Sequence, residues 1–233
     1  MFQVALATNA DLCNEQKISD MRIVLLGATG FSGKKVLQQL LKNNHQVTAL
    51  VRSVAKVQVK HSNLSIVKGN VLDTEVLEQV LSHQEAVINC LGIGGKGNGQ
   101  PNSFVSTATA KVVRAMEKQG VARLICLSNV GAGDSAHTQP WLFRKIILPY
   151  FMKWLKVIID DKNVMEPIVM NSQLDWTIVR CPNVVAKAPK NTIRTSVNGK
   201  KVKLSITNQD LANFLVAQLS SALFSKQVLS ISN

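Results

Sequence analysis

The sequence has few cysteines and histidines, and their spacing does not suit a metal site. Its 233 residues include four cysteines and four histidines. Cys13, Cys90, Cys126 and Cys181 are widely separated and lack the close pairing that zinc sites use. We therefore expect no bound metal. Cys90 and Cys126 lie in apolar runs, so we expect buried, reduced thiols of a cytoplasmic protein.

Long apolar runs and a secretory signal are also missing. A membrane-spanning helix needs about twenty consecutive apolar residues, and no such run occurs. Residues 1–20 lack the basic start and the apolar stretch of a secretory signal, so we expect the protein to be cytoplasmic. Because the first core strand begins near Met21 and no linker-like stretch follows, we predict an N-terminal extension over 1–20 and a single domain over 21–233.

Acidic residues are scarce relative to basic ones. The chain has 27 Lys and Arg against 14 Asp and Glu, which gives a formal net charge of +13. Seven basic residues and no acidic one lie between Asp175 and Asp210. No stacking aromatic and no nucleic-acid module accompany them, so we expect a solvated basic face that attracts anionic ligands and no nucleic-acid site.

The most informative segment is residues 21–33, with the sequence MRIVLLGATGFSG. Its apolar run is typical of an inner strand of a parallel sheet, and an amphipathic helical pattern follows it. Gly27, Gly30 and Gly33 lie between them, where glycine permits a tight turn and close approach of the backbone to a ligand. The unpaired amides at the start of such a helix bind phosphate. The segment therefore predicts a dinucleotide-binding turn.

The residue after the second predicted strand indicates which dinucleotide binds. This strand covers 46–51 and is followed by Arg52, at the place where an NAD-binding unit usually carries an acidic residue on the ribose 2′-hydroxyl. An arginine suits a 2′-phosphate. We therefore predict NADP(H) as the cofactor, held by Arg52 with help from Ser53 and Lys56.

Strand and helix patterns alternate through the rest of the chain. Further strands are expected at 64–67, 86–90, 123–127, 175–180 and 227–231. Helices are expected up to 81, at 103–118, at 160–172 with a bend or restart near Pro167, and after Thr207. With right-handed crossovers, this order predicts a Rossmann-type, doubly wound, mostly parallel α/β sheet with helices on both faces.

Residues 140–159 combine aromatic and basic side chains with no acidic one before Asp160. Such a segment suits a lid over a substrate, a subunit contact, or a peripheral membrane contact through 141–154. We favour a lid or contact, within a loop region of about 128–159, because the segment follows a strand whose end should border the nicotinamide. Pro140 and Pro149 are also expected to interrupt a long amphipathic helix. A monomer and a homodimer are both compatible with the sequence.

Several motifs together resemble a known family. They are GATGFSG at 27–33, LVR at 50–52, GNVLD at 69–73, LSNVGA at 127–132 and LDWTIVRCP at 174–182. Over about residues 21–233 the chain resembles the atypical short-chain dehydrogenase/reductases. Within them it is most similar to the NAD(P)H-binding group that contains flavin reductase/biliverdin reductase B and the NmrA-like proteins.

The resemblance implies roles for individual residues. The diphosphate site would comprise Gly27, Thr29, Gly30, Phe31, Ser32 and Gly33, and the 2′-phosphate site Arg52. Asn70, which replaces the usual aspartate, and Val71 would border the adenine, and Leu91 and Gly92 the nicotinamide ribose. Ser128 matches a serine near the cofactor and substrate, and is the candidate catalytic residue. Asn183 stands where biliverdin reductase has a histidine, which disfavours biliverdin as the substrate.

The catalytic pair of typical short-chain dehydrogenases is missing. They use Tyr-x-x-x-Lys, whereas the only tyrosine here, Tyr150, has Lys153 at the third position after it. Acceptors that need no acid from the protein, such as flavins and quinones, remain open. Ser128 would orient such an acceptor, or would only contact the cofactor. We therefore predict an NADPH-dependent reductase of a small planar acceptor; the alternative is a non-catalytic NADP(H)-sensing regulator of the NmrA-like type.

Overall fold

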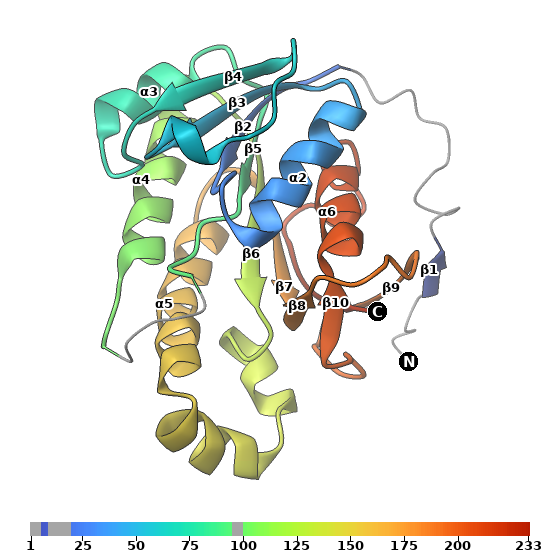
Figure 1. The fold of residues 1–233 in the computed structure, drawn as a ribbon. Helices are drawn as coiled ribbons and strands as arrows, with labels where there is room; N and C mark the ends of the chain where they lie inside the picture. Colours follow the sequence, from blue (N-terminus) through green and yellow to red (C-terminus); the bar gives the residue numbers. More distant parts are fainter. Residues whose placement is uncertain (1–5, 9–19, 95–99) are drawn as a thin grey trace.

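A twisted sheet forms the centre of the computed structural model, which describes residues 6–8, 20–94 and 100–233 (Figure 1). Its neighbouring strands run in the order β1-β9-β11-β7-β6-β5-β2-β3-β4. The parallel part consists of β2 (Arg22–Leu26), β3 (Gln46–Val51), β4 (Leu64–Lys68), β5 (Ala86–Asn89), β6 (Arg123–Asn129), β7 (Asp175–Cys181) and β11 (Gln227–Ser232). Every strand that the sequence predicts is therefore present.

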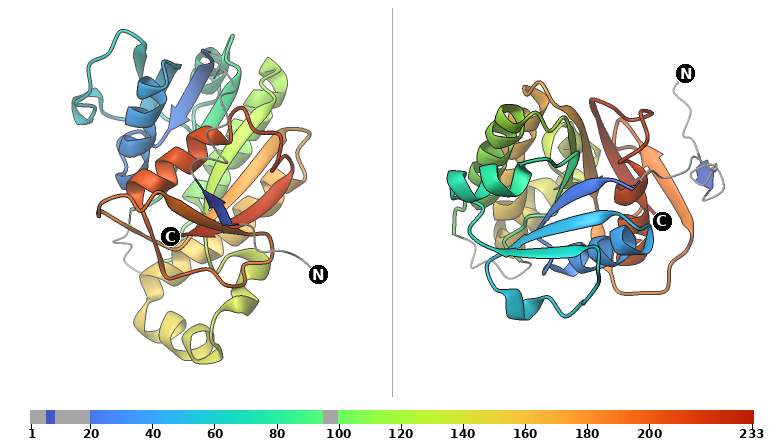
Figure 2. Two further views of the ribbon diagram at one scale, coloured as in Figure 1. Left: turned by 90° about the vertical axis from the view of Figure 1, so that its right-hand side faces the viewer. Right: turned by 90° about the horizontal axis from the view of Figure 1, so that it is seen from above.

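Helices cover both faces of this sheet (Figures 1 and 2). They are α2 (Phe31–Lys42), α3 (Thr74–Leu81), α4 (Phe104–Gln119), α5 (Lys153–Met170) and α6 (Asn208–Ala217). Alternate residues of β2 divide the core between the faces. Ile23 and Leu25 pack with α2 and α6, whereas Val24 and Leu26 pack with α3, α4 and α5. This arrangement confirms the Rossmann-type doubly wound fold.

The chain reverses its direction of winding at β2. This strand pairs in parallel with β3 on one side and with β5 on the other. The loops after β2 and β5 therefore diverge to opposite faces and leave a crevice at the carboxyl edge of the sheet. Ligands of doubly wound folds bind in such a crevice.

Four short strands were not predicted. They are β1 (Leu6–Thr8), β8 (Asn183–Val185), β9 (Thr192–Ser196) and β10 (Ser205–Thr207). β9 is antiparallel to β11, and β1 is antiparallel to β9, so the sheet ends in an antiparallel edge. β8 and β10 form a separate parallel pair beside it.

The predicted start of α5 and its restart near Pro167 were wrong, whereas an interruption within 140–159 is present, at Met152. α5 starts at Lys153 instead of 160 and continues through Pro167, because the next amides still bond: the N–H of Asn171 donates to the carbonyl of Pro167. Pro149 likewise lies inside a π-helical segment, η3 (Phe143–Phe151), and the break comes only at Met152. In the described part of the chain, none of the helices is long and apolar enough to cross a membrane.

Candidate functional site

A cavity of about 1030 Å³ lies at the carboxyl edge of the sheet. The ends of β2, β3, β5, β6 and β7 form its floor, and residues of η3 and α5 form one wall. It is lined by nearly all of the predicted site residues, namely Gly27, Thr29, Gly30, Phe31, Ser32, Arg52, Val71, Leu91, Gly92 and Ser128. The fold therefore brings together residues that are about a hundred positions apart in the sequence.

Two positions around the turn between β2 and α2, Gly27 and Gly33, have room for glycine only. Gly27 has a φ of +80°, and a Cβ built on it would lie 2.5 Å from the carbonyl oxygen of Cys90. A Cβ on Gly33 would lie 2.0 Å from the carbonyl oxygen of Gly27. Gly33 is buried in α2 and does not line the cavity itself, so it acts by letting the helix start close to the strand.

The start of α2 is suited to an anion. Gly30 is the N-cap residue and provides no side-chain hydrogen bond, and the first turn carries no acidic residue. The first amides of the helix are therefore left for a ligand, and the positive end of the helix dipole favours a negative charge there. Thr29 and Ser32 line the cavity beside these amides. The geometry fits the phosphates of a dinucleotide.

Arg52 lies at the same end of the cavity. It follows β3, is exposed to solvent, and lines the cavity next to the glycine turn. Ser53 and Lys56, which were predicted to assist Arg52, do not line the cavity. Asn70 does not line it either: its side-chain oxygen accepts a hydrogen bond from the N–H of Leu72. Its contact with adenine therefore stays a prediction, whereas the buried Val71 lines the cavity.

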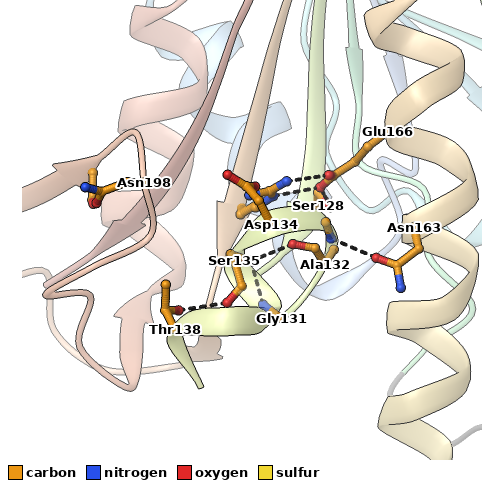
Figure 3. A network of polar contacts seen from close by, with 12 residues as sticks. Ser128, Gly131, Ala132, Asp134, Ser135, Thr138, Asn163, Glu166 and Asn198 are labelled. Carbon is orange, nitrogen blue, oxygen red and sulfur yellow. Dashed lines mark hydrogen bonds and ion pairs between the residues drawn. The ribbon is translucent and has the colours of Figure 1, made fainter. Parts of the chain in front are cut away.

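Ser128 marks the other end of the crevice and is part of a buried polar network (Figure 3). Its hydroxyl donates to Oε1 of Glu166 on α5 at 2.7 Å. Arg180 on β7 donates from Nε and Nη2 to the two carboxylate oxygens of Glu166, at 3.0 and 2.7 Å. Arg180 also pairs with the exposed Asp134. The network ties the ends of β6 and β7 to α5.

Lys162 is a site residue that sequence reasoning missed. It lies on α5, is buried, and lines the cavity. Its Nζ donates to the carbonyl oxygen of Leu127 at 2.7 Å and, more weakly, to that of Leu91 at 3.4 Å. Burial lowers the pKa of this amine below its usual value. A signal was present in the sequence, because Lys162 and Glu166 are spaced like the buried Met165 and Val169 of the same helix.

A further polar residue of α5 holds the neighbouring helix. The N-cap Ser103 of α4 gives no side-chain hydrogen bond to that helix. Instead, the carboxylate of Asp161 accepts from the N–H groups of Val105 and Ser106, at 2.8 and 3.1 Å. Asp161 therefore caps α4 from a distance in the sequence and fixes the wall of the cavity between the two helices.

Of the two cysteines predicted to be buried, Cys126 is buried, whereas Cys90 is half-buried and lines the cavity. Tyr150 is 70% exposed and does not line the cavity. Cys126 and Cys181 are buried and free, and burial raises the pKa of their thiols to about 11 and about 12. These thiols stay protonated at neutral pH. Cys13 lies outside the described residues, and within them no group of His, Cys, Asp or Glu side chains is placed to hold a metal ion.

Comparison with known proteins agrees with this geometry. A family model described as NAD(P)H-binding matches residues 27–222. The photosystem II assembly factor Ycf39 of Synechocystis is 26% identical over 161 residues, which cover 69% of this chain but only 44% of that protein.

Solved structures with similar folds include two reductases. A short-chain dehydrogenase/reductase from Veillonella parvula, in complex with NADP, superposes with a TM-score of 0.74 at 16% identity, covering 91% of this chain and 94% of that one. The anaerobilin reductase ChuY of Escherichia coli O157:H7 gives a TM-score of 0.72 at 19% identity, covering 91% and 96%.

Proposed function

The chain belongs to the NAD(P)H-binding family, and on this premise we propose that it is an NADPH-dependent reductase that passes hydride to a planar acceptor such as a flavin or a quinone. The observation that carries the proposal is the division of the cavity into two ends. The amides of α2 and Arg52 attract phosphates at one end, and an apolar wall that includes Phe143, Trp154 and Leu155 faces the other.

The residues present suit NADPH. The glycine turn admits the diphosphate without a Cβ in its path, and Arg52 is free of any ion pair within the described residues. A guanidinium in this position suits the charge of a 2′-phosphate. When bound, NADPH would supply the hydride. Val71 would border the adenine, and Leu91 and Gly92 the ribose of the nicotinamide.

In the proposed reaction, residues of the chain position the acceptor but contribute little general-acid catalysis. Ile158 lines the cavity four residues before Lys162, where a typical short-chain dehydrogenase carries its tyrosine. An isoleucine has no proton to give, so the acceptor takes its proton from water, as reduced flavins and quinones do. Lys162 donates to the carbonyl oxygens of Leu127 and Leu91, and so would hold the backbone that borders the ribose of the nicotinamide. The apolar wall would exclude water from the face of the acceptor.

Turnover with a panel of acceptors tests the proposal. The oxidation of NADPH is followed by its absorbance with FMN, FAD, menadione and a short-chain ubiquinone, and NADH is compared in parallel. We expect at least one acceptor to be reduced faster with NADPH than with NADH. Binding of NADPH by calorimetry, without turnover of any acceptor, would reject the reductase.

The name of one relative favours a second candidate function. Ycf39 is described as an assembly factor, which is a role in bringing proteins together. A non-catalytic chain that senses NADP(H) would bind different partners with and without the cofactor. Pull-downs with added NADPH and without it separate the two functions, because a sensor changes its partner set and a reductase does not.

A further inference from the structure

Residues 141–156, which we call the lobe, expose an unusual number of large apolar side chains. The lobe projects beyond the carboxyl edge of the sheet (Figures 1 and 2). Phe151 is 77% exposed, Tyr150 70% and Trp141 66%, and Leu142 and Ile146 are exposed as well. A contiguous set of this kind on a single chain marks a surface that contacts something else.

The spacing of these residues places them on one side of η3. In a π-helix the backbone bonds join residues five positions apart, so residues about four or five apart share a face. Leu142, Ile146 and Phe151 have this spacing. Phe143 and Met152 line the cavity on the inner side. The segment thus carries apolar side chains on two sides: the inner side faces the cavity, and the outer side is exposed.

The charges of the lobe indicate what supplies this cover. No acidic residue occurs between Asp134 and Asp160. Lys156 pairs with Asp160 at 2.6 Å, whereas Lys145 and Lys153 are exposed and form no ion pair within the described residues. A contact between the lobes of two copies would bring basic side chains together with no acidic side chain to neutralise them, which costs energy. An anionic surface would neutralise them instead.

We propose that the lobe docks on the surface of a membrane that contains anionic phospholipid. Trp141, Tyr150 and Phe151 lie at the level of the headgroups, where aromatic side chains are favoured, and Lys145 and Lys153 contact lipid phosphates and carboxylates. The lobe rests on the membrane and does not cross it. Because Phe143, Met152 and Trp154 also line the cavity, docking places the apolar end of the cavity against the bilayer.

Sedimentation with vesicles tests this proposal on the full chain. We expect the protein to pellet with vesicles of equal parts phosphatidylcholine and phosphatidylserine, and to stay in the supernatant with phosphatidylcholine alone. Binding should weaken as salt is raised. The double variant K145Q/K153Q should bind about 30-fold more weakly, since each lysine near an anionic surface contributes about fivefold.

Matched variants distinguish binding through the lobe from non-specific adsorption and from misfolding. K42Q/K60Q changes two exposed lysines elsewhere and should bind like the parent chain. W141S/F151S should lose binding, whereas L223S, at an exposed apolar site outside the lobe, should keep it. W141S/F151S and L223S should retain the melting temperature and NADPH affinity of the parent, because none of the substituted residues lines the cavity.

Three results would overturn the proposal. The first is failure to bind either kind of vesicle, and the second is equal loss of binding in the lobe variants and in their controls. The third is a concentration-dependent dimer, seen by light scattering and abolished by W141S/F151S, which would assign the face to a second copy. The vesicle assay requires no turnover, so its outcome is independent of the proposed reductase activity.

Discussion

Ser128 donates its hydroxyl hydrogen to Glu166 at 2.7 Å, and both side chains are buried (Figure 3). A carboxylate can only accept, so the hydrogen of Ser128 is committed to Glu166. Ser128 is fully buried, and its hydroxyl oxygen has only lone pairs left to offer. The hydroxyl is therefore poorly suited to polarise a carbonyl group of an acceptor.

Removal of the Glu166 carboxylate should destabilise the protein. Among the described residues, Glu166→Ala leaves the buried Arg180 with only the exposed Asp134 as a charged partner, and breaking a buried pair costs about 3–5 kcal/mol. We expect a loss of this size in the free energy of unfolding measured in urea. Glu78→Ala removes an exposed pair with Lys118 and should cost less than about 1 kcal/mol. Equal losses of unfolding free energy in the two variants would show that burial does not increase the contribution of the Glu166–Arg180 pair to stability.

Arg52 should determine the preference for NADPH. Arg52→Ala removes a charge-assisted contact to phosphate, typically worth about 1.5–3 kcal/mol, so the Kd of NADPH should rise about 10- to 150-fold. NADH has no 2′-phosphate, and its Kd should change little. Calorimetry with both nucleotides measures this difference. Arg114→Ala, at an exposed arginine of α4, is the matched control. An equal loss of affinity for NADPH and for NADH would contradict the assignment of Arg52 to the 2′-phosphate.

Gly33 should not tolerate any side chain. The new Cβ of Gly33→Ala would press against the carbonyl of Gly27, which is backbone and cannot swing away. We expect a loss of stability of at least about 1–3 kcal/mol and loss of nucleotide binding, because the turn must open. Gly92→Ala meets nothing within 4 Å and should keep the parent melting temperature. Normal nucleotide affinity in Gly33→Ala would show that the turn does not hold the phosphates.

Lys162 should affect activity more than stability. Lys162→Met keeps the length of the side chain and removes an amine that is costly to bury, but it also takes a donor from the carbonyl of Leu127, so the melting temperature should change little. We expect kcat/KM for the acceptor to fall about tenfold, the value of one charge-assisted hydrogen bond. Steady-state kinetics and thermal melting measure the two effects. A variant with full activity would remove Lys162 from the site.

His45 should make stability depend on pH. It is buried, its Nδ1 accepts from the N–H of Met21 at 3.3 Å, and burial lowers its pKa below the ordinary 6.5. Below about pH 6.5 the unfolded chain takes up a proton that the folded chain resists, so the unfolding free energy should fall on acidification and level off above that pH.

Urea midpoints measured between mildly acidic and neutral pH test this dependence. His45→Gln keeps an acceptor for the N–H of Met21 and should flatten the decrease on acidification. His61→Gln changes an exposed histidine and should leave the decrease as in the parent chain. A slope that is identical in all three proteins would assign the effect to other groups.

The parallel sheet and its ligand edge were predictable from local patterns. Apolar runs such as 23–26 indicate inner strands, and the glycines at 27 and 33 lie where a Cβ would meet backbone oxygens at 2.5 and 2.0 Å. The caps Asp73 and Thr207 were also predictable, because a cap bonds to amides two or three residues away. Each of these features depends on neighbours in the sequence.

The features that sequence reasoning missed depend on distant partners. Lys162 and Glu166 are of residue types that are usually exposed. Their partners, the carbonyl of Leu127 on β6 and the guanidinium of Arg180 on β7, are distant in the sequence. Strands β8 and β10 are three residues each and are defined only by their mutual pairing. The side-chain oxygen of Asn70 accepts from the nearby N–H of Leu72, and its contact with adenine stays a prediction. A polar side chain can bond to a ligand or to a nearby group of the protein, and the sequence alone does not distinguish the two cases.

Helix α5 joins the outermost and innermost parts of the molecule. It begins at Lys153, within the lobe, and carries Lys162 and Glu166 into the interior two to four turns further on. Because α5 is one continuous helix, anchoring its exposed end, as proposed, would also restrict the positions of the amine and the carboxylate inside.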